Sequence, residues 1–204
     1  MRMPRDTVED EDEAVLLARY AQGDAVAARL LTARLLPPVL SFASRMMAGD
    51  RAEAEDIAQE AMLRLWRAAP GWREGEAKVS TWLYRVVANL ATDRIRSRQR
   101  RHRHTGGATL ELSDAPEAAD GAPGAEARLI ASERMAALDR ALAALPERQR
   151  EAVVLRHIEG LSNPEIAAVM GVGIEAVESL TARGRRGLAQ ALGPYRALLG
   201  FEGD

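Results

Sequence analysis

One stretch of the chain shows neither helical nor strand periodicity, and it divides the sequence into two blocks with helical patterns. This stretch, Thr105–Ala127, is rich in Ala, Gly and Pro and carries five acidic residues and no basic one. Such a composition is typical of a flexible linker. The chain is therefore expected to form two small domains joined by a flexible acidic linker.

The composition of the two blocks favours helix over strand. Ala, Leu, Arg and Glu dominate, β-branched runs are scarce, and aromatic residues make up only 4% of the chain. We therefore expect an all-α fold. The expected divisions are an N-terminal tail (1–10), a first domain (11–104), the linker (105–129), a second domain (130–193) and a C-terminal tail (194–204).

Five helices are expected in the first block, separated by glycine, proline and polar residues. Pro37 and Pro38 should end the second of them, because proline lacks the N–H that a helix interior needs. Asp24 can cap that helix, and Ser80 or Thr81 can cap the fifth. The expected ranges are Glu11–Gln22, Asp24–Leu36, Val39–Met47, Asp50–Ala69 and a last helix from Thr81 through Ile95 into the Arg-rich segment that follows.

The second block predicts a helix-turn-helix. Ser132–Leu145 and Glu147–Glu159 come first, followed by a short helix, a glycine turn at residues 171–173 and a long helix. This is the geometry that DNA-binding proteins place in the major groove. An αα-hairpin with a solvated charged face would show the same pattern. The last two helices are expected at Pro164–Met170 and Ile174–Leu192, packed together through Ile166, Ala167, Val172, Ile174 and Val177.

The last long helix has distinct inner and outer faces when it is stepped at about 100° per residue. The outer face could enter a major groove, where Arg can pair with guanine and Glu can accept from cytosine N4. Its arginines can instead hold phosphates. The expected inner residues are Ile174, Val177, Gly184 and Leu188; the outer ones are Glu175, Glu178, Ser179, Ala182 and Arg186, with Arg183 and Arg185 nearby.

A cluster of arginines lies at the end of the first block. It is either a solvated helix terminus, which the helix dipole favours, or a phosphate-binding stripe. Aromatic, Arg and Asn side chains upstream suit unpaired bases, on which they can stack and to which they can hydrogen-bond. The arginines are Arg94, Arg96, Arg98, Arg100, Arg101 and Arg103, and the upstream residues are Trp82, Tyr84, Arg85 and Asn89.

Several classes of protein are disfavoured by what the sequence lacks. The absence of cysteine excludes disulfides and Cys-ligated zinc, and three histidines leave little scope for another metal site. We find no phosphate-binding glycine loop or nucleophile–base motif, so neither a cofactor nor enzymatic activity is expected. The N-terminus has no apolar signal region, so a cytoplasmic protein without membrane insertion is expected. The net charge of −2 predicts weak DNA binding by the chain alone.

Three segments in order resemble the sigma-70 family of bacterial RNA polymerase sigma factors, and specifically its extracytoplasmic-function (ECF) group. EAEDIAQEAMLRLWR (residues 53–67) is similar to that group's region 2 helix. STWLYRVVANLATDRIRSRQRR (residues 80–101) is similar to its promoter-melting helix. LPERQREAVVLRHIEGLSNPEIAAVMGV (residues 145–172) is similar to its region 4. The resemblance implies a non-catalytic subunit that directs promoter recognition, promoter melting and transcription initiation.

The resemblance also implies roles for particular residues. The clamp coiled coil of the polymerase β′ subunit would contact Asp56, Gln59, Glu60, Leu63 and Trp66. The −10 promoter element would contact Lys78, Trp82, Tyr84, Arg85, Asn89, Arg94 and Arg96, with Asn89 capturing a flipped base. Region 4 would contact the −35 element and the β flap. Its −35 contacts would come from Glu175, Glu178, Ser179, Ala182, Arg183, Arg185 and Arg186.

The recognition helix departs from the family pattern. Where the family commonly has Thr-Val-Lys-Ser-Arg, this chain has Ala-Val-Glu-Ser-Leu at residues 176–180, so two basic positions are acidic or apolar. An unusual −35 sequence is therefore expected. The resemblance also implies control by an anti-sigma factor. The alternatives are a one-component helix-turn-helix regulator, which would need its own dimer interface, and a decoy shaped like a sigma factor.

Overall fold

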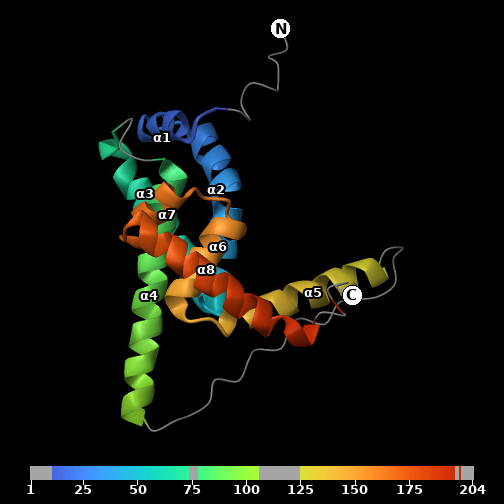
Figure 1. Cartoon of the computed structure of the whole chain (residues 1–204). Coiled ribbons are helices and arrows are strands. Elements are labelled where there is room, and N and C mark those ends of the chain that lie inside the picture. Colours follow the sequence, from blue (N-terminus) through green and yellow to red (C-terminus); the bar gives the residue numbers. More distant parts are fainter. Residues whose placement is uncertain (1–10, 74–77, 106–124, 196–197, 199–204) are drawn as a thin grey trace.

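A computed structural model describes residues 11–73, 78–105, 125–195 and 198, without the side chains of residues 102–105 and 125–128. Within these residues the chain is all helical and contains no strand (Figure 1). The helices are α1 (Glu13–Ala21), α2 (Ala25–Met46), α3 (Arg51–Ala68), η2 (Ala69–Gly71), α4 (Val79–Thr105), α5 (Ala125–Ala143), α6 (Glu147–His157), α7 (Asn163–Met170), α8 (Ile174–Ala191) and η3 (Gly193–Tyr195).

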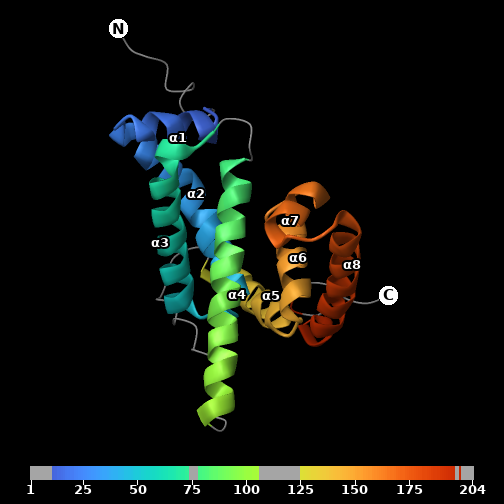
Figure 2. The same ribbon diagram turned by 90° about the vertical axis from the view of Figure 1, so that its left-hand side faces the viewer.

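In the N-terminal domain, α2, α3 and α4 lie side by side and α1 crosses one end of the bundle (Figure 2). The apolar residues that recur at helical spacing meet in its core. Leu31, Phe42, Leu65 and Leu83 are fully buried there. Burial of side chains of this size stabilises a domain by about 1.5–3 kcal/mol each. The expected all-α fold with two small helical domains is confirmed.

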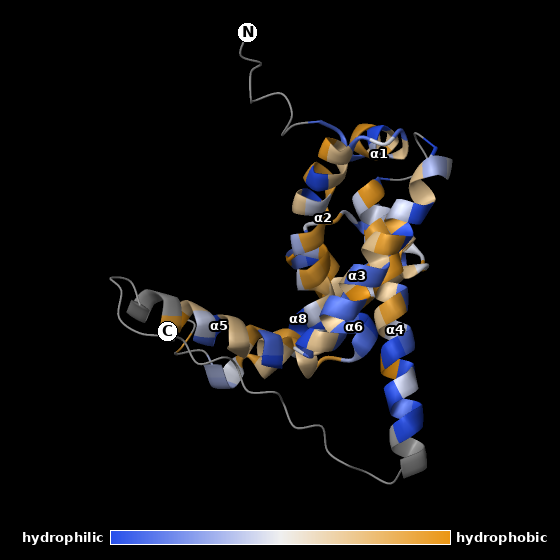
Figure 3. Ribbon diagram, turned by 180° about the vertical axis from the view of Figure 1, so that it is seen from behind, coloured by the Kyte–Doolittle hydropathy of each residue, from blue (hydrophilic) through white to orange (hydrophobic). Residues whose placement is uncertain are grey.

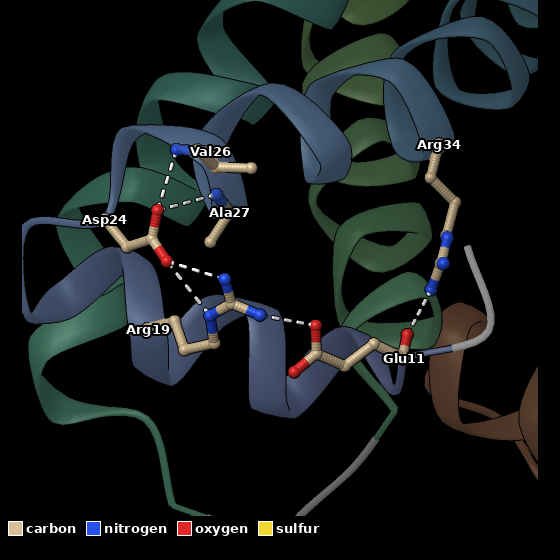
Figure 4. Close-up of polar contacts among 6 residues, drawn as sticks. All are labelled: Glu11, Arg19, Asp24, Val26, Ala27 and Arg34. Carbon is tan, nitrogen blue, oxygen red and sulfur yellow. Dashed lines mark hydrogen bonds and ion pairs between the residues drawn. The ribbon is translucent and has the colours of Figure 1, made fainter. Parts of the chain in front are cut away.

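The turn between α1 and α2 is held by a network of caps (Figure 4). Asp24 caps α2, as expected, because its Oδ1 accepts from the backbone N–H groups of Val26 and Ala27 at 2.8 and 3.2 Å. Its Oδ2 accepts from Arg19, whose guanidinium also donates to Glu11 at 2.6 Å. These donors hold the pKa of Asp24 below its ordinary value, with the Arg19 hydrogen bond the largest cause.

The expected helix end at Pro37 and Pro38 is wrong, because α2 continues through both prolines to Met46. The helix therefore lacks two N–H donors in its interior. Leu31, Leu35 and Val39 lie on one buried face of α2, before and after the two prolines. Packing of this face in the core therefore keeps the segment helical. By length and composition alone α2 could also cross a membrane, which is weak evidence because a buried core helix satisfies the same criteria.

Helix α4 begins at Val79, before the expected caps at Ser80 and Thr81. The N–H of Ser80 instead donates to Glu13 Oε2 of α1 at 3.0 Å, so a carboxylate from another helix satisfies the first turn. The N-terminal half of α4 is buried in the bundle. Its hydrophilic C-terminal half projects beyond the rest of the domain (Figure 3).

The C-terminal domain is built around α6, whose Val153, Val154 and Leu155 are buried. Helices α6, α7 and α8 occupy nearly the ranges expected for them. Helix α5 begins at Ala125, inside the stretch expected to be linker. Most of that stretch, residues 106–124, lies outside the described residues.

The two domains are in contact. Helix α7 packs against α4, and α5 and α6 contact α2 (Figure 2). The interface places one side of the C-terminal domain along the N-terminal half of α4 and leaves the outer face of α8 exposed.

Candidate functional site

A groove of about 510 Å³ lies between α2 and α3. Three of the residues expected to contact the polymerase clamp line it, namely Gln59, Leu63 and Trp66. Leu63 is 41% exposed although it is a large apolar residue. An exposed apolar side chain in a groove rimmed by polar residues is typical of a protein-binding site.

The other two clamp residues, Asp56 and Glu60, lie on α3 outside this groove lining. Asp56 is exposed. Glu60 accepts from Arg64 Nε at 2.8 Å, and this hydrogen bond lowers the pKa of Glu60. The groove therefore has an apolar floor and an acidic side.

Sequence reasoning missed the contribution of α2 to this groove. Thr32, Leu36 and Leu40 form its second wall. Their spacing of four residues was the available signal, but the helix was expected to end at Pro37. Leu36 and Leu40 were therefore assigned to different helices.

Helix α4 carries an exposed polar stripe. Trp82, Arg85, Asn89 and Arg96 fall within about 60° of one another when the helix is stepped at 100° per residue. Arg85, Asn89 and Arg96 are exposed, and Trp82 is half-buried. The Trp82 ring meets Trp72 edge to face, with centroids 5.7 Å apart, so its orientation is fixed by the loop before α4. This stripe of an indole, two guanidiniums and an amide can stack on unpaired bases and hydrogen-bond to them.

Three of the residues expected to contact the −10 element form hydrogen bonds or ion pairs within the protein instead. Tyr84 is buried, and its hydroxyl donates to Glu159 Oε2 at 2.6 Å. Burial and this acidic neighbour raise the pKa of Tyr84 well above its ordinary value. Lys78 Nζ pairs with Glu165 at 2.8 Å, and Arg94 pairs with Glu53 of α3 at 2.8 Å.

The arginines at the end of α4 differ in their surroundings: one forms ion pairs with another helix, and others are exposed to solvent. Arg98 donates to Asp50 at 2.6 Å and lies 3.2 Å from Glu53, so it fastens α4 to the start of α3. Arg96 and Arg100 are exposed and can contact phosphates. The side chain of Arg103 lies outside the described ones.

The helix-turn-helix is present. Ser162 precedes α7 as its N-cap, and its N–H and hydroxyl both donate to Glu165 Oε2, at 2.9 and 2.6 Å. Gly171 ends the helix with φ 64°, the left-handed conformation expected for the tight turn. Ile166 and Val177 are fully buried between α7 and α8. The sequence elements that predicted this motif are therefore confirmed.

Gly184 brings α8 close to α6. A Cβ placed there would lie 2.5 Å from Val153 Cγ2 and 2.9 Å from the Gln149 carbonyl oxygen. Only glycine therefore allows this approach. The expected inward position of Ile174 is wrong, because Ile174 is the first residue of α8 and is 47% exposed.

The outer face of α8 is available for DNA. Asn163 Nδ2 donates to Glu178 Oε1 at 3.4 Å and Arg183 Nε donates to the Ser179 carbonyl at 3.2 Å, so two of these side chains are held in place. Ala182 is half-buried. The exposed members of the expected set are Glu175, Glu178, Ser179, Arg183, Arg185 and Arg186. Within the described part of the chain, no cluster of three or more His, Cys, Asp or Glu residues is placed to hold a metal.

Comparisons with known proteins agree with this architecture. Residues 31–101 match the family model Sigma-70 region 2, and residues 135–188 match Sigma-70, region 4. The chain is 32% identical over 186 residues to the RNA polymerase sigma-H factor of Pseudomonas aeruginosa, covering 90% of this chain and 95% of that protein. It is 31% identical over 195 residues to the ECF RNA polymerase sigma-E factor of Escherichia coli K12, covering 89% and 95%.

Two solved structures share the arrangement of helices. CnrH in complex with the cytosolic domain of CnrY matches with a TM-score of 0.62 and 27% identity, covering 89% of this chain and 97% of that one. The sigma factor RpoE in complex with the anti-sigma factor NepR from Bartonella quintana shares the fold, with a TM-score of 0.63 and 23% identity over 84% and 96% of the two chains. With both family domains in order and relatives matched over nearly their whole length, the chain belongs to the ECF group of the sigma-70 family of bacterial RNA polymerase sigma factors.

Proposed function

We propose that this chain is an alternative sigma factor that directs RNA polymerase to promoters, opens them and starts transcription. One observation carries the proposal: a single chain contains regions 2 and 4 in order, and each presents an exposed surface suited to its task. The chain itself is non-catalytic and acts in the cytoplasm without membrane insertion. The proposed functional units are residues 11–104 and 130–193, joined by the linker.

The groove between α2 and α3 is proposed to bind the clamp coiled coil of the polymerase β′ subunit. Leu63 and Trp66 would insert between apolar residues of the partner, and buried apolar anchors of this kind supply most of the binding energy at such interfaces. Asp56 and Glu60 would meet basic residues at the rim, where complementary charge mainly speeds association.

The stripe on α4 is proposed to hold the −10 element. Flipping a base out of the stack costs a few kcal/mol, so a prepared pocket must offset that cost. Asn89 would hydrogen-bond to the flipped base, Trp82 would stack on it, and Arg85 and Arg96 would contact the backbone. Lys78, Tyr84 and Arg94 would join this surface only after leaving their present partners.

The outer face of α8 is proposed to contact the −35 element while region 4 rests on the β flap. Glu178 can accept from cytosine N4, and Arg183 and Arg186 can pair with guanine or hold phosphates. Glu178 and Leu180, which replace the two usual basic residues, favour a −35 sequence that differs from the common one.

An anti-sigma factor is a proposed regulator. The neighbouring structures of CnrH and of RpoE are complexes with CnrY and with the anti-sigma factor NepR. Since the chain has no cysteine, redox sensing by thiols would have to reside in such a partner.

Reconstitution with core RNA polymerase tests the proposal. The purified chain should co-elute with core polymerase in the absence of DNA, and the complex should give run-off transcripts from members of a random promoter library. A one-component regulator would bind duplex DNA without polymerase and would not co-elute with it. A chain that never associates with core polymerase would contradict the proposed function.

A further inference from the structure

Met135 on α5 differs from the other methionines of the described chain in its exposure. It is 48% exposed. The others are at most 6% exposed: Met46, Met47, Met62 and Met170. Oxidation of a methionine requires an oxidant to reach its sulfur. Among the described methionines, Met135 is therefore the one whose thioether is accessible to a small oxidant in the folded protein.

The Met135 sulfur lies beside a guanidinium of the other domain. Arg45 Nη2 of α2 is 3.8 Å from Met135 Sδ. Arg45 Nη1 donates to Ser41 Oγ, one turn earlier on the same helix. The Arg45 side chain is only 13% exposed. The guanidinium is therefore held in place beside the sulfur rather than moving freely in solvent.

This guanidinium has hydrogen-bonding capacity that its neighbours do not use. Arg45 Nε is buried and has no hydrogen-bond partner among the described residues, and the nearby Asp139 Oδ1, 3.9 Å away, is unsatisfied as well. A guanidinium presents five N–H donors, whereas a thioether sulfur is a weak acceptor. A stronger acceptor at the position of the Met135 sulfur would therefore find a donor already in place.

We propose that Met135 is an oxidation site for hydrogen peroxide, and that the oxygen of its sulfoxide accepts a charge-assisted hydrogen bond from Arg45. The sulfur lone pair attacks one peroxide oxygen, and the O–O bond breaks as the S–O bond forms. The departing hydroxide takes the proton of the transferred oxygen, so the thioether is oxidised by two electrons and the peroxide is reduced to water. The inference concerns the chain itself and does not rest on the proposed function.

The new hydrogen bond joins α5 to α2 and strengthens the contact between the two domains. An oxygen on the guanidinium side of the sulfur lies closer to Arg45 Nη2 than the sulfur does, and hydrogen bonds to a charged donor are stronger than those between neutral groups. The sulfur becomes a chiral centre, and the epimer that directs its oxygen toward Arg45 forms the bond. Sulfoxide reductases act on one epimer each, so the modification is reversible.

Peroxide treatment followed by peptide mass spectrometry tests the site. In the folded protein Met135 should be oxidised at least about tenfold faster than the buried Met62 and Met170, because oxidation rates follow exposure. In urea the three rates should become similar. Equal rates in the folded protein would overturn the assignment of Met135 as an oxidation site.

Urea unfolding monitored by circular dichroism tests the hydrogen bond. Oxidation should lower the equilibrium constant for unfolding of the wild-type protein about fivefold, the effect of one added hydrogen bond to a charged group. M135L, which has no sulfur at this position, should be unaffected by the same treatment. Sulfoxide reductase should return the oxidised wild-type protein to its original stability. An unchanged unfolding constant after oxidation of Met135 would contradict the bond to Arg45.

A substitution that carries an amide oxygen separates the bond from other effects of peroxide. M135Q places an acceptor near Arg45 without oxidant and should be more stable than M135L. The matched control is L129Q, which makes the same kind of change at a 51% exposed position of α5 and should give no gain over wild type. In the R45Q background M135Q should lose its advantage over M135L. Equal effects of M135Q and L129Q would likewise overturn the proposal.

Discussion

Glu151 is the most deeply buried ionisable residue of the C-terminal domain, with 1% of the residue exposed. Arg148 Nη1 donates to Glu151 Oε2 at 3.3 Å, while Arg148 Nη2 donates to the Met170 carbonyl at 3.1 Å. Burial raises the pKa of Glu151 to about 7, and Arg148 offsets this only in part. The charged carboxylate therefore destabilises the folded domain at neutral pH while it helps to orient Arg148 toward the end of α7.

Replacing Glu151 by Gln should stabilise the protein in a pH-dependent way. Since the folded pKa is raised from 4.5 to about 7, the wild-type carboxyl costs nothing below pH 4.5, and the cost grows as pH rises through 7. The shift corresponds to a ceiling of about 3 kcal/mol. Urea unfolding of both proteins should therefore show E151Q more stable at pH 8 and equal to wild type near pH 4.5. Equal stability at both pH values would show that the carboxyl is not destabilised by burial.

Asn89 is exposed on α4, so its replacement by Ala should leave the fold intact. If Asn89 holds a flipped base, N89A should reduce promoter opening by about tenfold, the cost of one lost polar contact. Closed-complex formation on duplex DNA should change much less. Permanganate reactivity of unpaired thymines and a duplex-binding assay measure the two steps. The control D93A alters another exposed position on α4 and should affect neither.

At the scale of elements, two glycines of α8 lie close to the segment that contains α6, but they differ in how well they would tolerate a larger side chain. A Cβ at Gly184 would lie 2.5 Å from Val153 Cγ2 and 2.9 Å from the Gln149 carbonyl oxygen. Relieving the second contact requires a shift of the α6 backbone. A Cβ at Gly187 meets only the Leu145 Cδ2 methyl, at 2.8 Å, which a side-chain rotation can move.

We therefore expect G184A to destabilise the C-terminal domain by about 1–3 kcal/mol, the usual cost of overpacking. G187A should be near neutral, since the higher helix propensity of Ala offsets a small displacement of Leu145. Chemical denaturation monitored by circular dichroism compares the two variants. If both lose the same stability, close approach at Gly184 is not what fixes the crossing.

The groove between α2 and α3 gives a second prediction at this scale. L63E places a charge in an apolar groove and should weaken binding to core polymerase by at least about tenfold. The matched control is L129E on α5, where the wild-type leucine is 51% exposed and lies outside the groove. Titration of core polymerase with each labelled variant measures the affinities. Equal binding by both would exclude this groove as the clamp site.

The helices with regular apolar spacing could be predicted from the sequence. Features that depend on contacts with another helix or with the other domain could not. The caps at Asp24 and Gly171 follow from local chemistry, and both were expected. The passage of α2 through Pro37 depends on burial of Leu35 and Val39 by neighbouring helices, which no local rule contains. Tyr84 was expected among the base-contacting residues, but its hydroxyl partner Glu159 comes from the other domain.

For the whole molecule, charge is distributed so that neither domain binds DNA strongly alone. Residues 1–104 carry 18 basic and 15 acidic residues, and residues 128–204 carry ten of each. Little counterion release is therefore available to the free chain. The ion pair of Lys78 with Glu165 across the domain interface reduces it further. Under the proposed function, promoter binding would therefore depend on the additional DNA contacts that RNA polymerase provides.

Contact between the two domains should depend on pH, because buried carboxyls lie at their interface. Burial raises the pKa of Glu159, which faces the Tyr84 hydroxyl of α4 and Arg45 of α2, and it raises the pKa of Asp139, which faces the same Arg45. Because these pKa values are higher when the domains are in contact, contact is favoured at low pH and is lost as pH rises through the raised values. Glu165 acts in the opposite direction, but Lys78 lowers its pKa to about 2, so it stays charged above pH 5.

The average distance between spin labels at Arg51→Cys and Gln190→Cys, one exposed position in each domain, should therefore shorten as the pH falls from about 8 to about 5. In E159Q the dependence should shrink to the part contributed by Asp139, because the amide does not titrate. A longer average distance at low pH would mean that the ion pair of Lys78 with Glu165, rather than the buried carboxyls, controls contact between the domains.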